Sequence, residues 1–170
     1  MERVVVIGNS GGGKSALARR LESKLDLSRV EIDTLLWLPG WRRSPDYDVE
    51  HARHIAADRW IIEGVGSRAS IPARLERATD IVLVDMPLWV HFWLAAKRQL
   101  EWTQGQGENP PGGFGETPPL EALFRTIWEI DREWMPDIRR LVDVEAQNGK
   151  RVYRIGSSEA LDGFVDTLVL

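Results

Sequence analysis

The chain of 170 residues contains no cysteine, which excludes disulfides, cysteine zinc sites and thiol catalysis. This composition fits a reducing compartment, and we expect a cytoplasmic protein. No apolar run approaches the length that spans a bilayer, and the chain enters a strand-like run at once, so we expect no signal peptide and no membrane partner. Positive charge is also scarce, because 22 Lys and Arg face 26 Asp and Glu and give a net charge of −4. That balance argues against direct nucleic-acid binding over a broad surface.

The composition that remains is that of one globular domain, residues 1–170. Apolar residues make up 43% of the chain and charged residues 28%, which suits a soluble protein with a sizeable core. Eight tryptophans are many for this length. Because large aromatic side chains dominate buried area, we expect most of them in the core.

Residues 3–18, RVVVIGNSGGGKSALA, carry the pattern around which the chain is organised. The β-branched run of residues 4–7 predicts a strand buried on both faces of a parallel sheet. The next residues have the spacing Gly-x4-Gly-Lys-Ser, and leucines four residues apart then predict an amphipathic helix. Strand, loop and helix together are the context that a phosphate-binding P-loop requires, so we expect nucleoside triphosphate binding.

Each part of this loop has a physical role. Glycines let backbone N–H groups approach phosphate oxygens, and the following helix N-terminus adds partial positive charge. Lys14 would reach the β- and γ-phosphates, and the Ser15 hydroxyl would ligate Mg²⁺. The cofactors expected are therefore ATP and Mg²⁺. The expected binding residues are Gly8, Asn9, Ser10, Gly11, Gly12, Gly13, Lys14, Ser15 and Ala16.

Further strands are predicted at 29–32, 60–62, 80–84 and 151–155, with helices at 44–57, 72–77, 88–102, 120–147 and 159–168. Such alternation predicts a three-layer α/β/α fold with a five-stranded parallel sheet and helices on both faces. Ligands of such folds bind beyond the carboxyl ends of the strands. The residues at that edge are the P-loop, Asp33, Glu63, Asp85 and Gly156.

Two stretches break the alternation. Residues 34–47 have no clean period and read as a loop or short helix on the ligand side. Residues 103–119 contain five glycines and four prolines, which cannot continue a helix, and a loop of this length is usually functional. The helix that follows contains Pro136, which should kink or split it.

These stretches together resemble the adenylate-kinase-like branch of small P-loop kinases, and in particular a bacterial group labelled DNA topology modulation proteins. The matching segments are GNSGGGKS (8–15), IDTLLWLPGW (32–41), WIIEGVGSR (60–68), RLERATDIVLVDMP (74–87) and KRVYRIGS (150–157). The resemblance implies a P-loop NTPase fold with sheet order 2-3-1-4-5. It also implies that residues 34–59 bind the acceptor and that 103–119 form a mobile lid.

The resemblance further implies roles for single residues. Asp33 would lie near acceptor and metal, Glu63 would hold Mg²⁺ through water, and Arg98 would reach the transferring phosphoryl group. With Lys14 these are the expected catalytic residues. The expected acceptor-binding residues are Asp33, Trp37, Arg42 and Arg68, and Gly156 and Ser157 would lie beside the adenine.

The residues themselves also allow structural roles. Asp33 suits a helix cap, Glu63 suits a purely structural role, and Asp85 is expected to cap the next helix. Trp37 and Trp41 suit either packing or a stacking wall for the acceptor. Helix residues His51 and His54 are expected to be exposed, and Arg125, Arg132 and Arg139 suit either an ion-paired solvent face or contacts with phosphate.

Two function classes follow. The first is an ATP- and Mg²⁺-dependent phosphotransferase, acting on a nucleotide, nucleoside or other small-molecule acceptor. A phosphorylated acceptor would need an arginine cluster, which Arg42, Arg43, Arg68 and Arg74 could supply, whereas a sugar-like acceptor would use Asp33 and Glu63. The alternative class is an ATP-binding switch or slow ATPase that acts through a protein or nucleic-acid partner. The absence of arginine from 103–119, and Leu88 where the resembling group often has arginine, keep this alternative open.

Overall fold

The computed structural model describes residues 1–105 and 119–168, so the expected lid, 103–119, lies almost wholly outside the described residues. The elements in chain order are β1 (Arg3–Gly8), α1 (Lys14–Leu25), β2 (Arg29–Glu31), α2 (Ile32–Leu36), β3 (Trp37–Leu38), β4 (Arg42–Arg43), α3 (Tyr47–Ala56), β5 (Trp60–Glu63), a 3₁₀ turn (Arg68–Ser70), α4 (Ile71–Arg77), β6 (Asp80–Val84), α5 (Leu88–Thr103), α6 (Leu120–Glu129), a π-helical segment (Ile130–Trp134), α7 (Met135–Gln147), β7 (Arg151–Ile155), α8 (Ser158–Gly163) and a second 3₁₀ turn (Phe164–Thr167).

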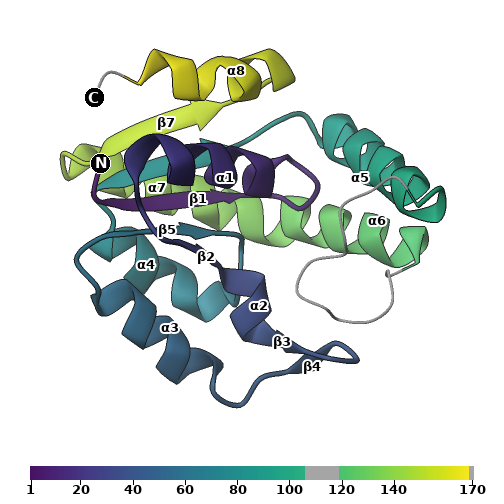
Figure 1. Ribbon diagram of the computed structural model, residues 1–170, viewed down its shortest axis with the longest axis horizontal. Helices are drawn as coiled ribbons and strands as arrows, with labels where there is room; N and C mark the ends of the chain where they lie inside the picture. The colour runs from purple at the N-terminus through teal and green to yellow at the C-terminus, as the bar shows by residue number, and fades with distance from the viewer. Residues whose placement is uncertain (106–118, 169–170) are drawn as a thin grey trace.

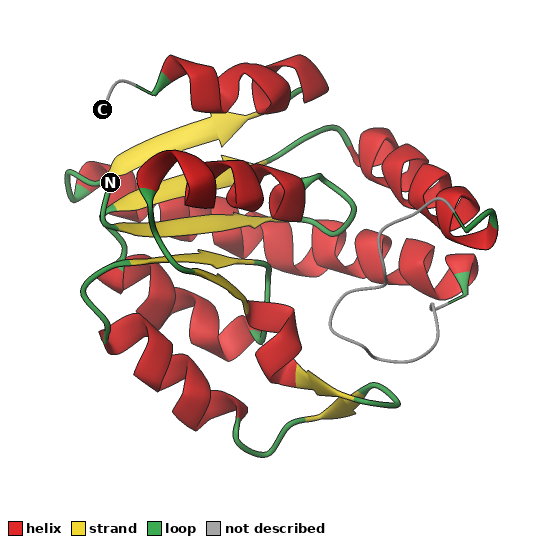
Figure 2. Ribbon diagram, in the orientation of Figure 1, coloured by secondary structure: helices red, strands yellow, loops and turns green. Residues whose placement is uncertain are grey.

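Five strands form one parallel sheet in the order β2-β5-β1-β6-β7, which confirms the expected order of second, third, first, fourth and fifth parallel strand (Figure 2). The central strand β1 lies between β5 and β6, with Val6 opposite Glu63 and Gly8 opposite Val84. The carboxyl ends of β5, β1 and β6 therefore lie side by side at one edge of the sheet. This register sets the P-loop, which follows β1, beside the residues that follow β5 and β6.

Helices cover both faces of the sheet, as the α/β/α expectation requires (Figure 1). On one face, Val4 and Val6 of β1 pack in a cluster with α1 and the C-terminal turn. On the other face, Val5 and Ile7 pack in a cluster with α4 and α7. Because successive side chains of a strand point to opposite faces, the unbroken run of apolar residues in β1 serves both clusters.

Helices α5 and α6 lie side by side and extend away from the sheet, joined by a ring contact between Phe92 and Phe124 at 4.9 Å (Figure 1). Their outward faces have no sheet to cover them, so Trp89, Trp93 and Trp128 are exposed. The expectation that most tryptophans are core residues is therefore wrong, since only Trp60 is fully buried. The structure confirms that these residues are helical, but periodicity cannot distinguish a helix that packs on the core from one that projects away from it.

The stretch after β2 is more ordered than expected. Strand β2 ends at Glu31, and Asp33 lies in the first turn of α2 rather than at a strand end. Residues 37–43 form a small antiparallel hairpin, β3–β4, with Trp41 in the left-handed region at φ 57°. Helix α3 begins at Tyr47 after an Asp46 cap, three residues later than the start of the helix expected at 44–57.

On α3, His51 is buried and stacks on Tyr47 with ring centroids 5.8 Å apart. The expectation of an exposed histidine at this position is wrong. Residues four apart share one helix face, and the face that Tyr47 buries takes His51 with it. His54, by contrast, is half-buried.

The helical stretch from Leu120 is interrupted, as expected from Pro136. Five residues, Ile130–Trp134, are π-helical, and Pro136 stands in the first turn of α7. Proline lacks the N–H that would continue the hydrogen-bond ladder and its ring crowds the carbonyl four residues back, so the ladder loosens at the preceding turn. Such π segments are frequent at functional sites.

Within residues 1–105 and 119–168, no helix combines the length and the apolar character needed to cross a bilayer.

Candidate functional site

The P-loop connects β1 to α1 through backbone conformations that require glycine. Gly11 and Gly13 have φ of 75° and 77°, in the region that side chains disfavour. At Gly8 a Cβ would stand 2.1 Å from the carbonyl oxygen of Val84 on β6. Gly13 caps α1 and its carbonyl accepts from Leu17 N at 3.0 Å. The loop therefore has the backbone that the sequence motif predicts.

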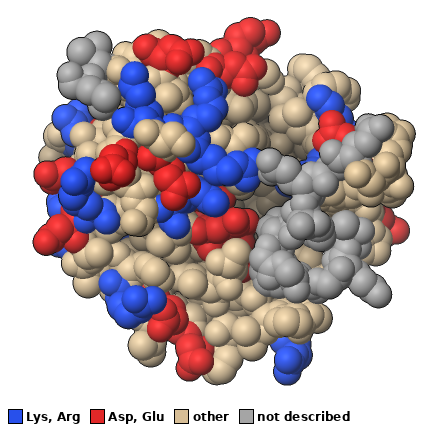
Figure 3. Space-filling model, in the orientation of Figure 1, with Lys and Arg blue, Asp and Glu red and all other residues tan. Residues whose placement is uncertain are grey.

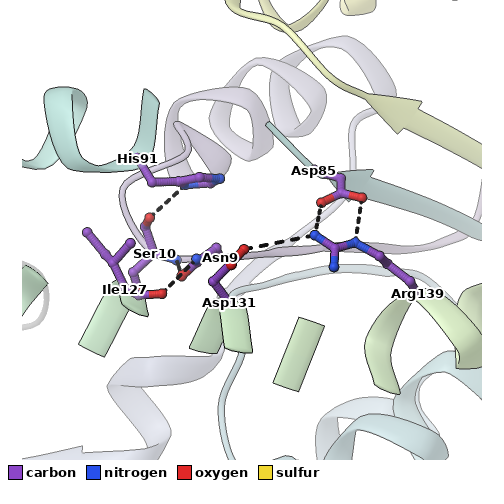
Figure 4. A network of polar contacts seen from close by, with 7 residues as sticks. All are labelled: Asn9, Ser10, Asp85, His91, Ile127, Asp131 and Arg139. Atoms are coloured by element: carbon purple, nitrogen blue, oxygen red, sulfur yellow. Dashed lines mark hydrogen bonds and ion pairs between the residues drawn. The ribbon is translucent and has the colours of Figure 1, made fainter. Parts of the chain in front are cut away.

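Buried polar side chains tie the outside of this loop to the helices around it (Figure 4). The Asn9 amide donates to the carbonyl of Ile127 in α6 at 2.9 Å, and its oxygen accepts from Ser10 N at 2.7 Å. His91 of α5 contacts the Ser10 carbonyl through Nδ1 at 2.8 Å. Burial lowers the pKa of His91, while the Ser10 and Met86 carbonyls raise it. The Asn9 side chain thus faces α6, although the sequence placed this residue among the ATP-binding set.

A second tether joins the end of β6 to α7 (Figure 4). Arg139 donates to Asp85 through Nε at 2.9 Å and Nη2 at 2.8 Å, and Asp131 in the π-helical segment lies 3.9 Å from the same guanidinium. The expectation that Asp85 caps the next helix is wrong, because Pro87 occupies the cap position of α5. Asp143, four residues after Arg139 on α7, pairs instead with Arg154 of β7.

Lys14 is a buried cation at the centre of the site. Its ammonium donates to the carbonyl of Asn9 at 2.7 Å, and the residue is 7% exposed. Burial is the main cause that lowers the pKa of Lys14, and Arg98 lowers it further; Glu63 and Asp33 act in the opposite direction. Glu63, Asp33 and Arg98 are therefore all close enough to Lys14 to influence its charge.

Glu63, at the end of β5, is 2% exposed. Burial raises the pKa of its carboxyl, while the charge of Lys14 and a hydrogen bond with Ser15 lower it. One of its oxygens, Oε1, has no hydrogen-bond partner among the described residues and lies 3.6 Å from Arg29 Nη1. A buried carboxylate oxygen without a donor is costly unless something else satisfies it.

That oxygen bears on the expected metal ion. Among residues 1–105 and 119–168, no group of three or more His, Cys, Asp or Glu side chains could hold a metal alone. Mg²⁺ rarely needs such a cage, since it keeps several waters and binds through one or two carboxylates plus substrate phosphates. The Ser15 hydroxyl beside the Glu63 carboxylate, whose Oε1 has no hydrogen-bond partner among the described residues, fits this chemistry.

Asp33 lies across a glycine-containing turn from Glu63. Its Oδ1 accepts from the Gly66 N–H at 3.1 Å. Gly64 and Gly66 have φ of 108° and 65°, and a Cβ at Gly66 would stand 2.5 Å from the Tyr47 hydroxyl. Only glycine fits these two positions, and their backbone orients the carboxylate of α2.

Arg74 of α4 supports the same turn from inside. Its Nη2 donates to the carbonyls of Val65 at 2.9 Å and Gly64 at 3.3 Å, and the residue is fully buried. Its Nε and Nη1 have no hydrogen-bond partner among the described residues. The sequence carried a signal for this burial, because Arg74 follows Ile71 by three residues and precedes Leu75 on the apolar face of α4.

Other expected site residues lie farther out. Arg68 pairs with Asp137 of α7, and Arg42 on the hairpin is exposed, with Nε 3.4 Å from the Pro39 carbonyl. Trp37 and Trp41 meet edge to face at 6.2 Å on the same hairpin. The structure thus brings the expected catalytic residues together, whereas the expected acceptor-binding residues other than Asp33 are distributed over the edge.

On the nucleotide side, Arg98 of α5 packs over the Trp102 ring at 4.9 Å, and burial lowers the pKa of its guanidinium. Ser157 caps α8, its hydroxyl accepting from Ala160 N at 3.1 Å. Leu161 of α8 comes so close to the P-loop that a Cβ on Gly13 would stand 2.8 Å from it. Helix α8, which begins after the Gly156–Ser157 turn, therefore adjoins the loop.

The sequence analysis did not predict the long-range contacts that hold the site residues in place, although it predicted the P-loop and its lysine. Nothing in the local sequence marks His91 as a contact of Ser10, or Arg139 as the partner of Asp85, because these pairs join residues 81 and 54 positions apart. Arg125 and Arg132 take the solvent-face alternative, the first pairing with Glu121 at 2.9 Å and the second lying over the Trp128 ring at 5.2 Å.

Comparison with known proteins bears on the fold. A shikimate kinase from Acinetobacter baumannii matches with a TM-score of 0.62 and 12% identity, over 98% of this chain and 89% of that chain. A gluconokinase from Sinorhizobium meliloti matches with a TM-score of 0.45 and 17% identity, over 82% of this chain and 97% of that chain. A putative kinase from Chloroflexus aurantiacus matches with a TM-score of 0.49 and 13% identity, over 96% of this chain and 94% of that chain.

No protein-family model matches the chain, and no curated protein matches it in sequence. The resemblance to DNA topology modulation proteins therefore stays a prediction. At these identities the likeness to shikimate kinase concerns the fold alone. The chain has an α/β fold with a five-stranded parallel sheet flanked by helices, and it shares this fold with the shikimate kinase.

Proposed function

We propose that this protein is an ATP- and Mg²⁺-dependent phosphotransferase that acts on a small-molecule acceptor. The observation that carries the proposal is the grouping of Lys14, Glu63 and Asp33 at the carboxyl edge of the sheet, next to a P-loop backbone. A site that only binds phosphate would need Lys14 but neither of the two carboxylates. Two carboxylates beside it suit transfer to an acceptor hydroxyl.

The residues divide the work by position. The P-loop N–H groups and the N-terminus of α1 bind the phosphates, and Lys14 exchanges its contact with the Asn9 carbonyl for the β- and γ-phosphates. Arg98 stabilises charge on the transferring group. Asp33 orients the acceptor hydroxyl and takes its proton, as the acceptor oxygen bonds to the γ-phosphorus and the bond to the β,γ-bridging oxygen breaks. ADP and the phosphorylated acceptor are the products.

Ser15 and Glu63 would hold Mg²⁺, the second through a bound water that donates to Oε1, which has no hydrogen-bond partner among the described residues. When bound, the ion supplies charge neutralisation across the β- and γ-phosphates. Residues 34–59, which include α2 and the hairpin, would bind the acceptor, and the Gly156–Ser157 turn would lie beside the adenine. The substrate contacts of Trp37, Arg42 and Arg68 belong to this proposal as well.

The test is ATP consumption with Mg²⁺, screened against nucleosides, nucleoside monophosphates, polyols and small acids, with Asp33→Asn as the paired variant. One acceptor that accelerates turnover many-fold, and loses its effect in Asp33→Asn, would establish the transferase and name its substrate. Uniformly slow turnover with tight ATP binding would reject it in favour of an ATP-dependent switch with a macromolecular partner.

A further inference from the structure

Whether the acceptor carries an anionic group depends on which arginines at the acceptor side are available to bind one. A phosphate or carboxylate on a substrate is usually held by bidentate guanidinium contacts. Four arginines, Arg42, Arg43, Arg68 and Arg74, belong to the segments on this side. The structure engages each of them elsewhere.

Arg68 is the one best placed by the sequence, two residues beyond the Gly66 N–H that binds Asp33. Its Nη2 pairs with Oδ2 of Asp137, while Oδ1 of the same carboxylate accepts from Arg140 at 2.7 Å. The hydrogen bonds from both arginines lower the pKa of Asp137, so this carboxylate stays charged. An anionic substrate would have to compete with it for Arg68.

Arg74 is nearer to the carboxylates but points into the protein. It has no exposed surface and is held by the Gly64 and Val65 carbonyls. A ligand could reach its guanidinium only by displacing the turn that orients Asp33. Its charge therefore offsets Asp33 and Glu63 from behind without offering a contact to a substrate.

Arg42 and Arg43 lie on the exposed hairpin. Arg42 donates to the Pro39 carbonyl at 3.4 Å, and Arg43 lies 3.9 Å from Asp48 and over the Tyr47 ring at 5.9 Å. No arginine or lysine occurs in the sequence of residues 103–119.

What the edge offers instead is hydrogen-bond acceptors and aromatic surface. Asp33 and Glu63 suit the hydroxyls of a substrate, and Trp37 with Trp41 forms an edge-to-face pair on the adjoining hairpin. Carboxylates and tryptophan rings are the combination that suits a sugar or polyol, whose hydroxyls donate and whose C–H faces pack on rings.

We infer that the acceptor is a polyhydroxylated compound without an anionic group, of the sugar, polyol or nucleoside type. The inference rests on the proposed phosphotransferase function. It excludes nucleoside monophosphates, sugar phosphates and sugar acids as preferred acceptors, because like charges placed together oppose binding.

The experiment measures kcat/KM for ADP release with Mg-ATP on matched pairs of acceptors that differ in one anionic group. Suitable pairs are adenosine and adenosine 5′-monophosphate, glucitol and gluconate, and glucose and glucose 6-phosphate. In every pair that accelerates turnover, we expect the uncharged member to be at least about tenfold better. A better anionic member would overturn the inference and leave the transferase in place. If no member accelerates turnover while ATP binds, the proposed function fails and the inference falls with it.

A pair of variants then tests the reason. Asp137→Asn removes the carboxylate that occupies Arg68, and we expect it to shift the preference several-fold toward the anionic member. Arg140→Gln removes the other partner of Asp137 and leaves the Arg68 pair intact, so its preference should equal that of the wild type. An unchanged preference in Asp137→Asn, or an equal shift in both variants, would show that Arg68 does not set the charge selectivity.

Discussion

At the residue scale, Lys14 is a buried cation next to the P-loop backbone. Its ammonium donates to a carbonyl oxygen at 2.7 Å, and burial lowers its pKa. Such a charge is poorly solvated in the free protein and gains most when phosphate oxygens arrive. Site geometry of this kind could be predicted from the P-loop spacing, because the loop and its lysine are adjacent in sequence.

We expect Lys14→Met to weaken ATP binding by at least about tenfold, since it removes the one side-chain cation within the loop. The free energy of unfolding should stay constant or rise, because an incompletely paired buried charge is lost. Titration calorimetry with Mg-ATP and urea unfolding measure the two effects. Lys24→Met, an exposed position on the same helix α1, is the control and should change neither. Unchanged ATP affinity in Lys14→Met would contradict both proposed functional classes.

His51 predicts a dependence of stability on pH. Burial and the charge of Arg74 lower its pKa from 6.5 to about 4, with Asp48 acting in the opposite direction and His54 adding to the decrease. Between these values the unfolded chain binds the proton and the folded chain does not, so stability falls as pH drops from about 6.5 to about 4.

The full loss of stability is roughly 3–4 kcal/mol, because the pKa falls by about 2.5 and each pKa unit corresponds to about 1.4 kcal/mol. Urea unfolding at pH 7 and pH 4.5 should show a smaller loss in His51→Gln than in the wild type. His54→Gln is the matched control on the same helix, and its half-buried position predicts a smaller change. Equal losses in His51→Gln and the wild type would show that this histidine does not titrate as described.

At the scale of elements, the P-loop is held by helices that follow it by more than 80 residues. The Asn9 amide donates to the Ile127 carbonyl of α6, and His91 of α5 contacts the Ser10 carbonyl, so both projecting helices contact the outer side of the loop (Figure 4). Gly11 and Gly12 allow this approach, since a Cβ on either would stand within 2.9 Å of His91. The conformation of the P-loop therefore depends on contacts with α5 and α6 as well as on its own glycines.

Asn9→Ala should lower the free energy of unfolding by about 1–3 kcal/mol, because it leaves the buried Ile127 carbonyl without the amide donor. We also expect weaker ATP binding, since the loop loses its link to α6. Urea unfolding and calorimetry measure both. Ser23→Ala removes an exposed hydrogen bond to the Arg19 carbonyl on α1 and should cost far less. Equal costs for the two variants would mean that the Asn9 contact does not order the loop.

At the scale of the whole molecule, charges of both signs are interspersed on the face that Figure 3 shows. Together with the net charge of −4, this distribution gives no reason to expect broad electrostatic attraction to nucleic acid. The proposed ligand site lies instead at one edge of the sheet, where β5, β1 and β6 end together.

Binding there should stabilise the entire chain, because the loop, sheet edge and surrounding helices form one packed unit. With Mg-ATP at about 100 times its dissociation constant, we expect a rise in Tm of about 5–10 °C. Chelation of Mg²⁺ should remove much of this rise, and Lys14→Met should remove most of it. A thermal scan monitored by tryptophan fluorescence measures all three, and an equal rise with and without Mg²⁺ would argue against a role for Ser15 and Glu63 in holding the ion.

The amino-acid sequence by itself determined the parallel sheet and the P-loop, because these rest on local periodicity, on glycine spacing and on the alternation of strands with helices. The strand order was expected only from the resemblance to small P-loop kinases, and the structure confirms it. It also placed Asp33 and Glu63 at the ligand edge, since carboxyl ends of parallel strands meet there. The tertiary structure alone decided which side chains support them. The Asn9, His91 and Arg139 contacts, the burial of Arg74 and the pairing of Arg68 with Asp137 all join segments distant in sequence, and their energies depend on distance and burial that no local pattern records.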